Sequence, residues 1–370
     1  MRLKMRWVVV FTAWLFLAGS AAAQSDLKTR NVVLIVCDGV RWQEVFQGPD
    51  RALLDKKHGG VSNVAELRKD FWRDTPAEAR AALLPFFWSV IAQRGQLLGN
   101  QTKGSVARVT NGLKFSYPGY NEMLTGRADP RVDSNDPRPN PNVTVFEWLA
   151  GLPEFQGRVA AFATWQVFDA IFNRERSGLY VFSGWEPRAP RVDTPRQAVL
   201  DDLYRTTTRL WSDNSFDSLM HAAMREYVQR ERPRVLFVGY GESDEWAHSG
   251  RYDLVLRSIH QFDQFVAELW DLLQAMPEYR DKTTFILTAD HGRGGGLKKW
   301  RDHGRDVAGA ENIWLAVLGP DTPALGERAQ TAPVMQSQIA ATIAALLGQD
   351  FRATVPTAAP PIREVIARPH

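Results

Sequence analysis

Residues 31–42 read NVVLIVCDGVRW, and this stretch decides the fold class. The apolar run from Val32 to Cys37 is too short for a helix and rich in β-branched residues, so it predicts a buried strand of the parallel type. Asp38 follows at the carboxyl end of that strand, where open α/β sheets bind their ligands. An isolated Asp there could also simply cap the turn before the next helix. The stretch predicts an α/β fold and makes Asp38 a candidate ligand.

The stretch TTFILTADHGRGGG, residues 283–296, repeats this arrangement. A predicted strand from Thr283 to Leu287 runs into Asp290 and His291. Adjacent residues on a strand point to opposite faces, but the chain turns where the strand ends, so both side chains can converge on one ion. An Asp-His-Gly sequence at a strand end is seldom a plain turn, and both residues are candidate metal ligands.

A third apolar run, Val235 to Val238, lies in PRVLFVGYGESDEWAHSG and precedes Asp244 and His248. Four residues apart on a helical turn, these two side chains share one face and can chelate a single ion. A solvated surface pair is the alternative. His303, in KKWRDHGRD, is a lone loop histidine; it becomes a candidate because this ion would otherwise lack a third protein ligand.

Ser116 is the candidate nucleophile in GSVARVTNGLKFSYPGYNEMLTG, residues 104–126. Pro118 suits a first helical turn and Gly126 ends the helix, which places Ser116 just before a helix amino terminus. Free N–H groups and the positive dipole end hold an anionic oxygen there. Coordination to a metal would remove the hydroxyl proton and activate Ser116 without a histidine base. A helix cap is the alternative role, and Thr110 is a rival nucleophile.

Hard and borderline ligands in separate clusters are typical of a two-metal hydrolase, whose chemistry is in-line displacement at phosphorus or sulfur. The candidate ligands, in chain order, are Asp38, Ser116, Asp244, His248, Asp290, His291 and His303.

These motifs resemble the alkaline phosphatase superfamily, and most closely its branch of type I phosphodiesterases and nucleotide pyrophosphatases. The likeness spans about residues 31–350 and implies a three-layer α/β/α sandwich with a central, mostly parallel sheet, in a single catalytic domain over residues 24–370. The segments that carry it are Asp38-Gly-Val-Arg41, Ser116-Tyr-Pro with Thr125-Gly126, Asp244 with His248, Thr288-Ala-Asp290-His291-Gly292, and His303-Gly304.

The resemblance also implies two zinc ions and a role for each ligand. One zinc is held by Asp244, His248 and His303. The other is held by Asp38, Asp290, His291 and the oxygen of Ser116, which forms a phosphoserine intermediate.

The chain departs from this branch after the nucleophile. The branch typically has threonine followed by Phe-Pro-Asn, whereas this chain has Ser116-Tyr117-Pro118-Gly119. The asparagine that contacts phosphate would then come from the Pro-rich stretch RADPRVDSNDPRPNPN, as Asn135 or Asn140. The choice between monoester and diester substrates stays open.

Two arginines and two loops are further candidates for contact with substrate. Arg41 and Arg293 could each bind phosphate oxygens bidentately, or could pair with a nearby carboxylate. The loops Ala128 to Pro141 and PRAPRVDTPRQ from Pro187 are expected to form the substrate rim. Tryptophans near strand ends could stack on a sugar or base, or belong to the core; they are Trp42, Trp165, Trp185, Trp246 and Trp300.

Alternating strands and helices predict the α/β architecture in more detail. Strands are expected at Val32, Val159, Val235, Thr284 and Ile313, and helices over Asp201 to Gln229, Tyr252 to Gln274 and Gln336 to Leu347.

The amino terminus, MRLKMRWVVVFTAWLFLAGSAAAQ, predicts a signal peptide over residues 1–23 and a periplasmic or secreted protein. A retained anchor is the alternative, but the apolar stretch is short for a span, so no stable membrane insertion is expected after cleavage. Without Arg2, Lys4 and Arg6 the basic count is 45 − 3 = 42, against 42 acidic residues. This balance argues against binding a nucleic acid polymer. The single cysteine, Cys37, permits no internal disulfide.

The sequence therefore predicts an exported two-zinc phosphoric ester hydrolase with a small-molecule phosphate ester as its substrate. A sulfatase-like hydrolase is the competing enzyme, but it requires a Cys/Ser-x-Pro-x-Arg setting, and Ser116-Tyr-Pro-Gly-Tyr lacks the arginine. A phosphate-ester-binding protein with little activity is the other alternative, against which the complete ligand set argues. Oligomeric state is not predicted.

Overall fold

The computed structural model describes residues 27–185 and 194–367. The predicted signal peptide and residues 187–193 of the second expected rim loop lie outside the described residues. Within the described ranges, no helix combines the length and apolar character needed to cross a membrane.

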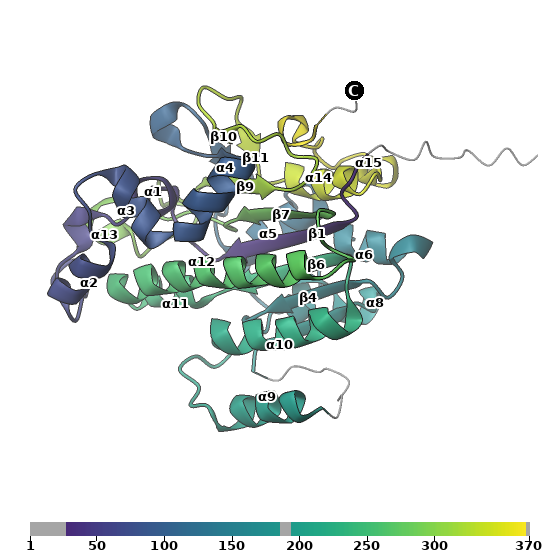
Figure 1. Ribbon diagram of the computed structural model, residues 1–370, viewed down its shortest axis with the longest axis horizontal. Helices are drawn as coiled ribbons and strands as arrows, with labels where there is room; N and C mark the ends of the chain where they lie inside the picture. Colours follow the sequence, from purple (N-terminus) through teal and green to yellow (C-terminus); the bar gives the residue numbers. More distant parts are fainter. Residues whose placement is uncertain (1–26, 186–193, 368–370) are drawn as a thin grey trace, which may run out of the picture.

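An eight-stranded sheet forms the centre of the molecule, in the order β10-β2-β9-β7-β1-β6-β4-β5 (Figure 1). The strands from β7 to β5 in this order run parallel, whereas β9 is antiparallel to both β7 and β2. The predicted, mostly parallel sheet is confirmed. Its strands are β1 (Asn31–Cys37), β2 (Gln96–Leu98), β4 (Val159–Ala163), β5 (Tyr180–Ser183), β6 (Val235–Tyr240), β7 (Thr283–Thr288), β9 (Leu315–Leu318) and β10 (Gly326–Glu327).

Strand β1 lies between β6 and β7 and is buried throughout. A strand covered on both faces gains by being apolar at every position, which explains why the run from Val32 to Cys37 shows no alternation. The strand expected at Ile313 is short and belongs to a second, three-stranded sheet of β3 (Ala107–Arg108), β8 (Asn312–Ile313) and β11 (Val334–Met335).

Helices cover both faces of the large sheet and complete the predicted three-layer sandwich (Figure 1). On one side, α14 (Gln338–Leu346) packs against α5 (Ser116–Thr125) and α6 (Val145–Ala150). On the other side, α10 (Asp217–Glu231) and α12 (Tyr252–Ala275) cross in front of the strands. The remaining helices are α1 (Trp42–Gln47), α2 (Val64–Phe71), α3 (Pro76–Leu83), α4 (Ala92–Arg94), α7 (Phe168–Ile171), α8 (Arg174–Ser177), α9 (Pro195–Thr206), α11 (Glu242–His248), α13 (Gly296–Lys299) and α15 (Phe351–Thr354).

The predicted single helix from Asp201 to Gln229 is wrong. The chain forms α9 and α10, separated by residues 207–216. This break contains the run Ser212-Asp213-Asn214-Ser215, whose side chains compete for backbone hydrogen bonds. The backbone carbonyl of Asp213 accepts a hydrogen bond from Gln166 N–H at 2.7 Å, which holds the break beside the carboxyl end of β4. The helices predicted over Tyr252–Gln274 and Gln336–Leu347 are confirmed as α12 and α14.

The strand register sets the position of the candidate ligands. Cys37, the last residue of β1, pairs with Tyr240 of β6, and Val36 pairs with Thr288 of β7. Since these strands are parallel, the residues that follow them emerge at the same edge of the sheet. Asp38, helix α11 and the Asp290-His291 turn are therefore neighbours.

Candidate metal centre

Three side chains converge on one ring nitrogen of His291. Its Nε2 lies 3.4 Å from Asp38 Oδ1, 3.4 Å from Asp290 Oδ2 and 3.5 Å from Ser116 Oγ. All four residues are buried. The structure thus brings together the four residues that the family resemblance assigns to one ion.

Each of the two carboxylates uses one oxygen for the protein and leaves the other free. Asp38 Oδ2 accepts a hydrogen bond from the hydroxyl of Tyr120 at 2.9 Å, and Asp290 Oδ1 accepts one from Gly39 N–H at 3.0 Å. The opposite oxygens, Asp38 Oδ1 and Asp290 Oδ2, are buried and have no hydrogen-bond partner. Unpartnered buried carboxylate oxygens are costly, so their joint direction towards His291 fits a bound cation.

The protonation states of this group fit a cation as well. Nδ1 of His291 lies 2.9 Å from the carbonyl of Gly292, which leaves Nε2 with its lone pair towards the carboxylates. Burial lowers the pKa of His291 and keeps the ring neutral. Burial also raises the pKa of Asp38 to about 8 and that of Asp290 to about 7. A cation would reverse this effect, because metal binding favours the ionised carboxylates.

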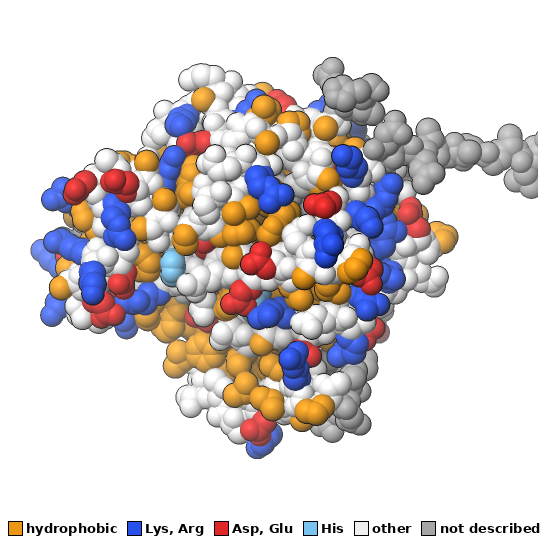
Figure 2. All heavy atoms as spheres, in the orientation of Figure 1, with side chains coloured by type: hydrophobic (Ala, Val, Ile, Leu, Met, Phe, Trp, Pro, Cys, Tyr) orange, Lys and Arg blue, Asp and Glu red, His pale blue; other side chains and the backbone are white. Residues whose placement is uncertain are grey.

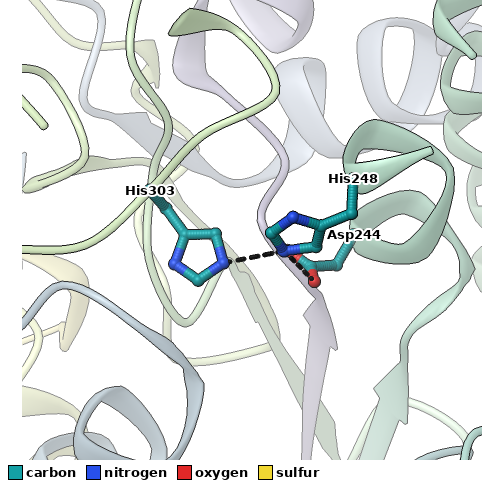
Figure 3. A group of neighbouring side chains, drawn as sticks. All are labelled: Asp244, His248 and His303. Atoms are coloured by element: carbon teal, nitrogen blue, oxygen red, sulfur yellow. Dashed lines mark hydrogen bonds and ion pairs between the residues drawn. The ribbon is translucent and has the colours of Figure 1, made fainter. Parts of the chain in front are cut away.

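A second group consists of Asp244, His248 and His303 (Figure 3). Nε2 of His248 lies 3.2 Å from Asp244 Oδ2 and 2.9 Å from Nε2 of His303. The i,i+4 spacing on α11 places the first pair on one face, as predicted, and the loop histidine reaches them from the opposite side. His303 Nδ1 lies 3.3 Å from the carbonyl of Lys114, which leaves its Nε2 available to an ion. Burial holds the pKa of His303 well below its ordinary value.

Asp244 stands between the two groups. Its Oδ1 lies 3.8 Å from His291 Nε2 and 3.9 Å from His303 Nε2. Ligand atoms of Asp38, Asp244 and His291 also lie within 4.8 Å of one another. The two candidate ion positions therefore adjoin, and Asp244 can contact either one. Mixed carboxylate and imidazole donors of this kind suit zinc.

Both candidate arginines pair with carboxylates. The Arg41 guanidinium is buried and forms a two-bond ion pair with Glu44, so the structure shows the pairing alternative. The Arg293 guanidinium is also buried, but it contacts Asp244, one of the candidate ligands, and donates to the carbonyl of Gly39. Arg293 thus contacts the candidate metal centre, whereas Arg41 pairs with Glu44, which is not a candidate ligand.

The two candidate asparagines have different environments. Asn135 Oδ1 accepts a hydrogen bond from Tyr117 N–H at 2.9 Å, directly beside Ser116. Asn140 is fully buried; its side chain donates to the carbonyl of Ile171 at 3.2 Å and accepts from Asn142 N–H at 2.9 Å. Of the two, only Asn135 lies next to the nucleophile.

Gly119 explains why no asparagine follows Pro118 in this chain. A Cβ atom at Gly119 would lie 2.5 Å from the backbone carbonyl oxygen of Asp290. Helix α5 therefore approaches the turn after β7 too closely for any side chain at this position.

Sequence analysis missed the residues that hold the nucleophile helix in place. Tyr120, which donates to Asp38, lies four residues after Ser116, so helical periodicity could have placed both on the same face. Glu122 is fully buried and accepts hydrogen bonds from the backbone N–H groups of Thr110 and Asn111 at 2.8 Å. Thr110, the rival nucleophile, donates its hydroxyl to Glu122 at 2.6 Å. No sequence signal marks this last interaction.

Two of the tryptophans considered for stacking, Trp185 and Trp300, are buried in the core. Trp42, Trp165 and Trp246 are partly buried and pack against it.

The sequence profile of the Metalloenzyme superfamily matches residues 206–350, the segment that contains five of the seven candidate ligands, from Asp244 to His303. Over this segment the chain is similar to alkaline-phosphatase-like metalloenzymes. The predicted superfamily and the predicted class of metal-dependent hydrolase are confirmed at this level; the phosphodiesterase branch stays a prediction.

Solved structures of this superfamily share the fold at low identity. Wild-type alkaline phosphatase PafA is 10% identical, with a TM-score of 0.57, over 92% of this chain and 99% of that one. The phosphonate monoester hydrolase SpPMH from Silicibacter pomeroyi is 13% identical, with a TM-score of 0.54, over 92% and 78%. A putative sulfatase from Bacteroides thetaiotaomicron is 12% identical, with a TM-score of 0.53, over 92% and 75%. No curated protein matches the chain in sequence.

Proposed function

We propose that this metalloenzyme is an exported, two-zinc hydrolase of phosphoric esters that acts through a phosphoserine at Ser116. The convergence of Ser116 Oγ with the unpartnered oxygens of Asp38 and Asp290 on His291 Nε2 carries the proposal. A serine hydroxyl placed among metal ligands can lose its proton to the metal site and needs no separate base.

The candidate ligands form two groups, one for each proposed zinc ion. Asp38, Asp290 and His291 would hold one zinc, with the Ser116 hydroxyl, while His248 and His303, with Asp244, would hold the other. When bound, the zinc ions supply Lewis acidity to the ester oxygens and make a hydroxyl or water nucleophilic at neutral pH.

The nucleophile is further supported by its helix and by one arginine. Ser116 opens α5, so the positive end of the helix dipole favours the negative charge that develops on the phosphoryl oxygens, although the N–H of Tyr117 is taken by Asn135. Arg293, which contacts Asp244, places a positive charge at the boundary between the two ions.

The residues after Ser116 favour phosphate over sulfate esters. Tyr120 stands where a sulfatase motif has arginine, and its hydroxyl is committed to Asp38. The fold is similar to that of a phosphatase and of a putative sulfatase, so it does not distinguish phosphate hydrolysis from sulfate hydrolysis. The preference for phosphate esters is therefore proposed from the side chains that follow Ser116.

The chemical test combines metal analysis with a small set of chromogenic esters. We expect about two zinc ions per chain, hydrolysis of 4-nitrophenyl phosphate or bis(4-nitrophenyl) phosphate, and far slower release from 4-nitrophenyl sulfate. Chelation should abolish the activity and zinc should restore it. Faster cleavage of the sulfate than of either phosphate would replace the proposal by a sulfatase.

Export is proposed from the sequence of residues 1–23 and has a separate test. The mature protein should occur in the periplasm or medium and begin at Gln24. An intact amino terminus in the cytoplasm would contradict it. On the face shown in Figure 2, basic and acidic side chains are mixed rather than gathered into one basic area; that no nucleic acid polymer binds stays a proposal.

A further inference from the structure

A cavity of about 890 Å³ lies beside the nucleophile helix. We call it the side cavity. Its walls are the Pro-rich loop at residues 135–139, the turn and helix α7 at residues 166–170, the start of α8 at residues 173–175, and Asp213 from the break between α9 and α10. The Pro-rich loop belongs to the expected substrate rim.

The residue next to the nucleophile fixes two walls of the side cavity. Tyr117 donates its backbone N–H to Asn135 Oδ1 at 2.9 Å, and its hydroxyl donates to the carbonyl of Arg138 at 2.6 Å. The same hydroxyl lies 3.3 Å from the carbonyl of Ala170 on α7. Asn135 lines the side cavity and binds the residue next to Ser116, so a group esterified to a phosphate on Ser116 would lie close to this cavity.

The cavity wall is built before any substrate arrives. Asn140 ties the Pro-rich loop to the end of α7, with its backbone N–H donating to the carbonyl of Ala170 at 2.9 Å and its side chain to that of Ile171 at 3.2 Å. Arg176 of α8 donates to the carbonyl of Asn140 at 2.8 Å. A preformed wall favours selection among ligands, because little ordering cost accompanies binding.

The lining is acidic. It contains four acidic residues and one basic residue, a formal charge of 1 − 4 = −3, with Arg174 as the basic residue. Nη1 of Arg174 lies 3.7 Å from Asp169 Oδ1, and Nη2 of Arg138, beside the lining, lies 2.7 Å from Asp136 Oδ2, so ion pairs offset two of the acidic charges. The acidic residues are Asp136, Asp169, Glu175 and Asp213.

Most polar groups of this lining accept hydrogen bonds. The carboxylate of Asp213 accepts a hydrogen bond from the indole N–H of Trp165 at 2.9 Å, which holds it in place. The carboxylate of Asp169 accepts one from the hydroxyl of Ser183 at 3.0 Å. Glu175 adds an exposed carboxylate at the start of α8. Such a surface complements a ligand that donates hydrogen bonds and repels a second anionic group.

We propose that the side cavity binds the organic group of the ester and selects a hydrogen-bond-donating group, ammonium or hydroxyl, against one that carries a carboxylate or a second phosphate. This rests on the proposed function for the position of the phosphate. It separates the preferred substrates from diesters whose second group is anionic.

The test uses esters that differ only in the charge of the organic group. We use three 4-nitrophenyl phosphodiesters, whose second group is 2-aminoethyl, 2-hydroxyethyl or carboxymethyl. Because all three share one leaving group, differences in kcat/KM report how well the side cavity accepts the second group. The corresponding monoesters are titrated into metal-loaded Ser116→Ala protein by calorimetry, which measures binding without turnover. We expect the carboxymethyl compounds to be at least about tenfold poorer than the other two in the low-salt arm, since like charges repel across the cavity.

A double variant, Glu175→Gln with Asp213→Asn, removes two charges and keeps both hydrogen-bond acceptors. We expect it to bring the discrimination against carboxymethyl to within about threefold. Asp271→Asn, an exposed carboxylate on α12, is the matched control and should leave the discrimination unchanged.

Equal affinities for the three monoesters in the wild-type cavity, or full discrimination retained in the double variant, would overturn the inference. Loss of all hydrolysis with the binding preference intact would instead count against the proposed function and leave the cavity assignment standing.

Discussion

Ser116 Oγ lies 3.5 Å from Nε2 of His291, across 175 positions of sequence. The contact arises because α5 begins against the turn that follows β7, with Gly119 facing the carbonyl of Asp290. The nucleophile and its metal ligands are thus positioned by the approach of one helix to one strand end.

Ser116→Ala should lose the chemical step and keep the fold and the metals. The variant removes the attacking oxygen but only one of several ligands, so turnover should fall by roughly 10³-fold or more. Thr110→Ala should cost far less, because the Thr110 hydroxyl is bound to Glu122 at 2.6 Å. Steady-state rates and zinc content of both variants check this, and the reverse order of effects would reassign the nucleophile.

His303→Ala should reduce bound zinc by about one ion and cut turnover more than about 100-fold. A position held by Asp244 and His248 alone binds its ion weakly. His260→Ala is the control, since His260 lies on α12 with Nδ1 2.9 Å from the carbonyl of Leu83. Equal zinc content in the two variants would show that His303 is not a ligand.

Gly119→Ala should separate the nucleophile from its metal ligands. The added methyl would lie 2.5 Å from the backbone oxygen of Asp290, so helix or turn must shift. We expect lower zinc content and a loss of activity of at least about tenfold. Gly295→Ala, where nothing lies within 4 Å of the added atom, should be close to wild type. Unchanged activity in Gly119→Ala would show that this contact does not position Ser116.

Asp263 should make the stability of the protein fall with rising pH. Burial raises its pKa from an ordinary 3.8 to about 7, although it accepts N–H groups of Phe86 and Phe87 at 2.8 Å. Between these pKa values the native state holds a proton that the unfolded state releases, so this contribution is complete below pH 3.8 and lost by about pH 7.

Asp263→Asn keeps an acceptor and removes the titration. Relative to wild type, its free energy of unfolding should therefore rise by about 2 to 4 kcal/mol between pH 4 and pH 8. Chemical denaturation of chelated samples at both pH values measures this apart from the metal centre. A difference that does not change with pH would mean that the Asp263 carboxyl titrates normally.

Glu122→Ala should destabilise the loop that leads into Ser116. It leaves the partly buried N–H groups of Thr110 and Asn111 without this acceptor, at a cost of about 1 to 3 kcal/mol. Glu122→Gln retains one side-chain oxygen and should cost less. Thermal unfolding of the two variants tests this order, and a fully stable Ala variant would show that the loop is held by other contacts.

Much of the fold could be predicted because its strands are covered on both faces. Continuous apolar runs such as Val32 to Cys37 leave little choice but a buried strand, and three of these strands, β1, β6 and β7, are followed by candidate ligands. The prediction of one helix from Asp201 to Gln229 was wrong because the break depends on a contact between distant segments. Asp213 and Asn214 pair with the residues that follow β4, and local sequence does not reveal this contact.

The candidate site shows the same division. Residues in local motifs, such as Asp244 with His248, could be placed by spacing alone, whereas His303 needed an argument from coordination number. The choice between Asn135 and Asn140 depends on which one reaches Tyr117, and the position of Asp244 between two ions depends on tertiary distances. No pattern in the sequence encodes either relationship.

Anomalous diffraction at the zinc absorption edge, from crystals of the purified protein, tests the central claim most directly. The account predicts two peaks, one in contact with Asp38, Asp290, His291 and Ser116, the other with His248 and His303, and both beside Asp244. A single peak, or a second peak away from these residues, would contradict it.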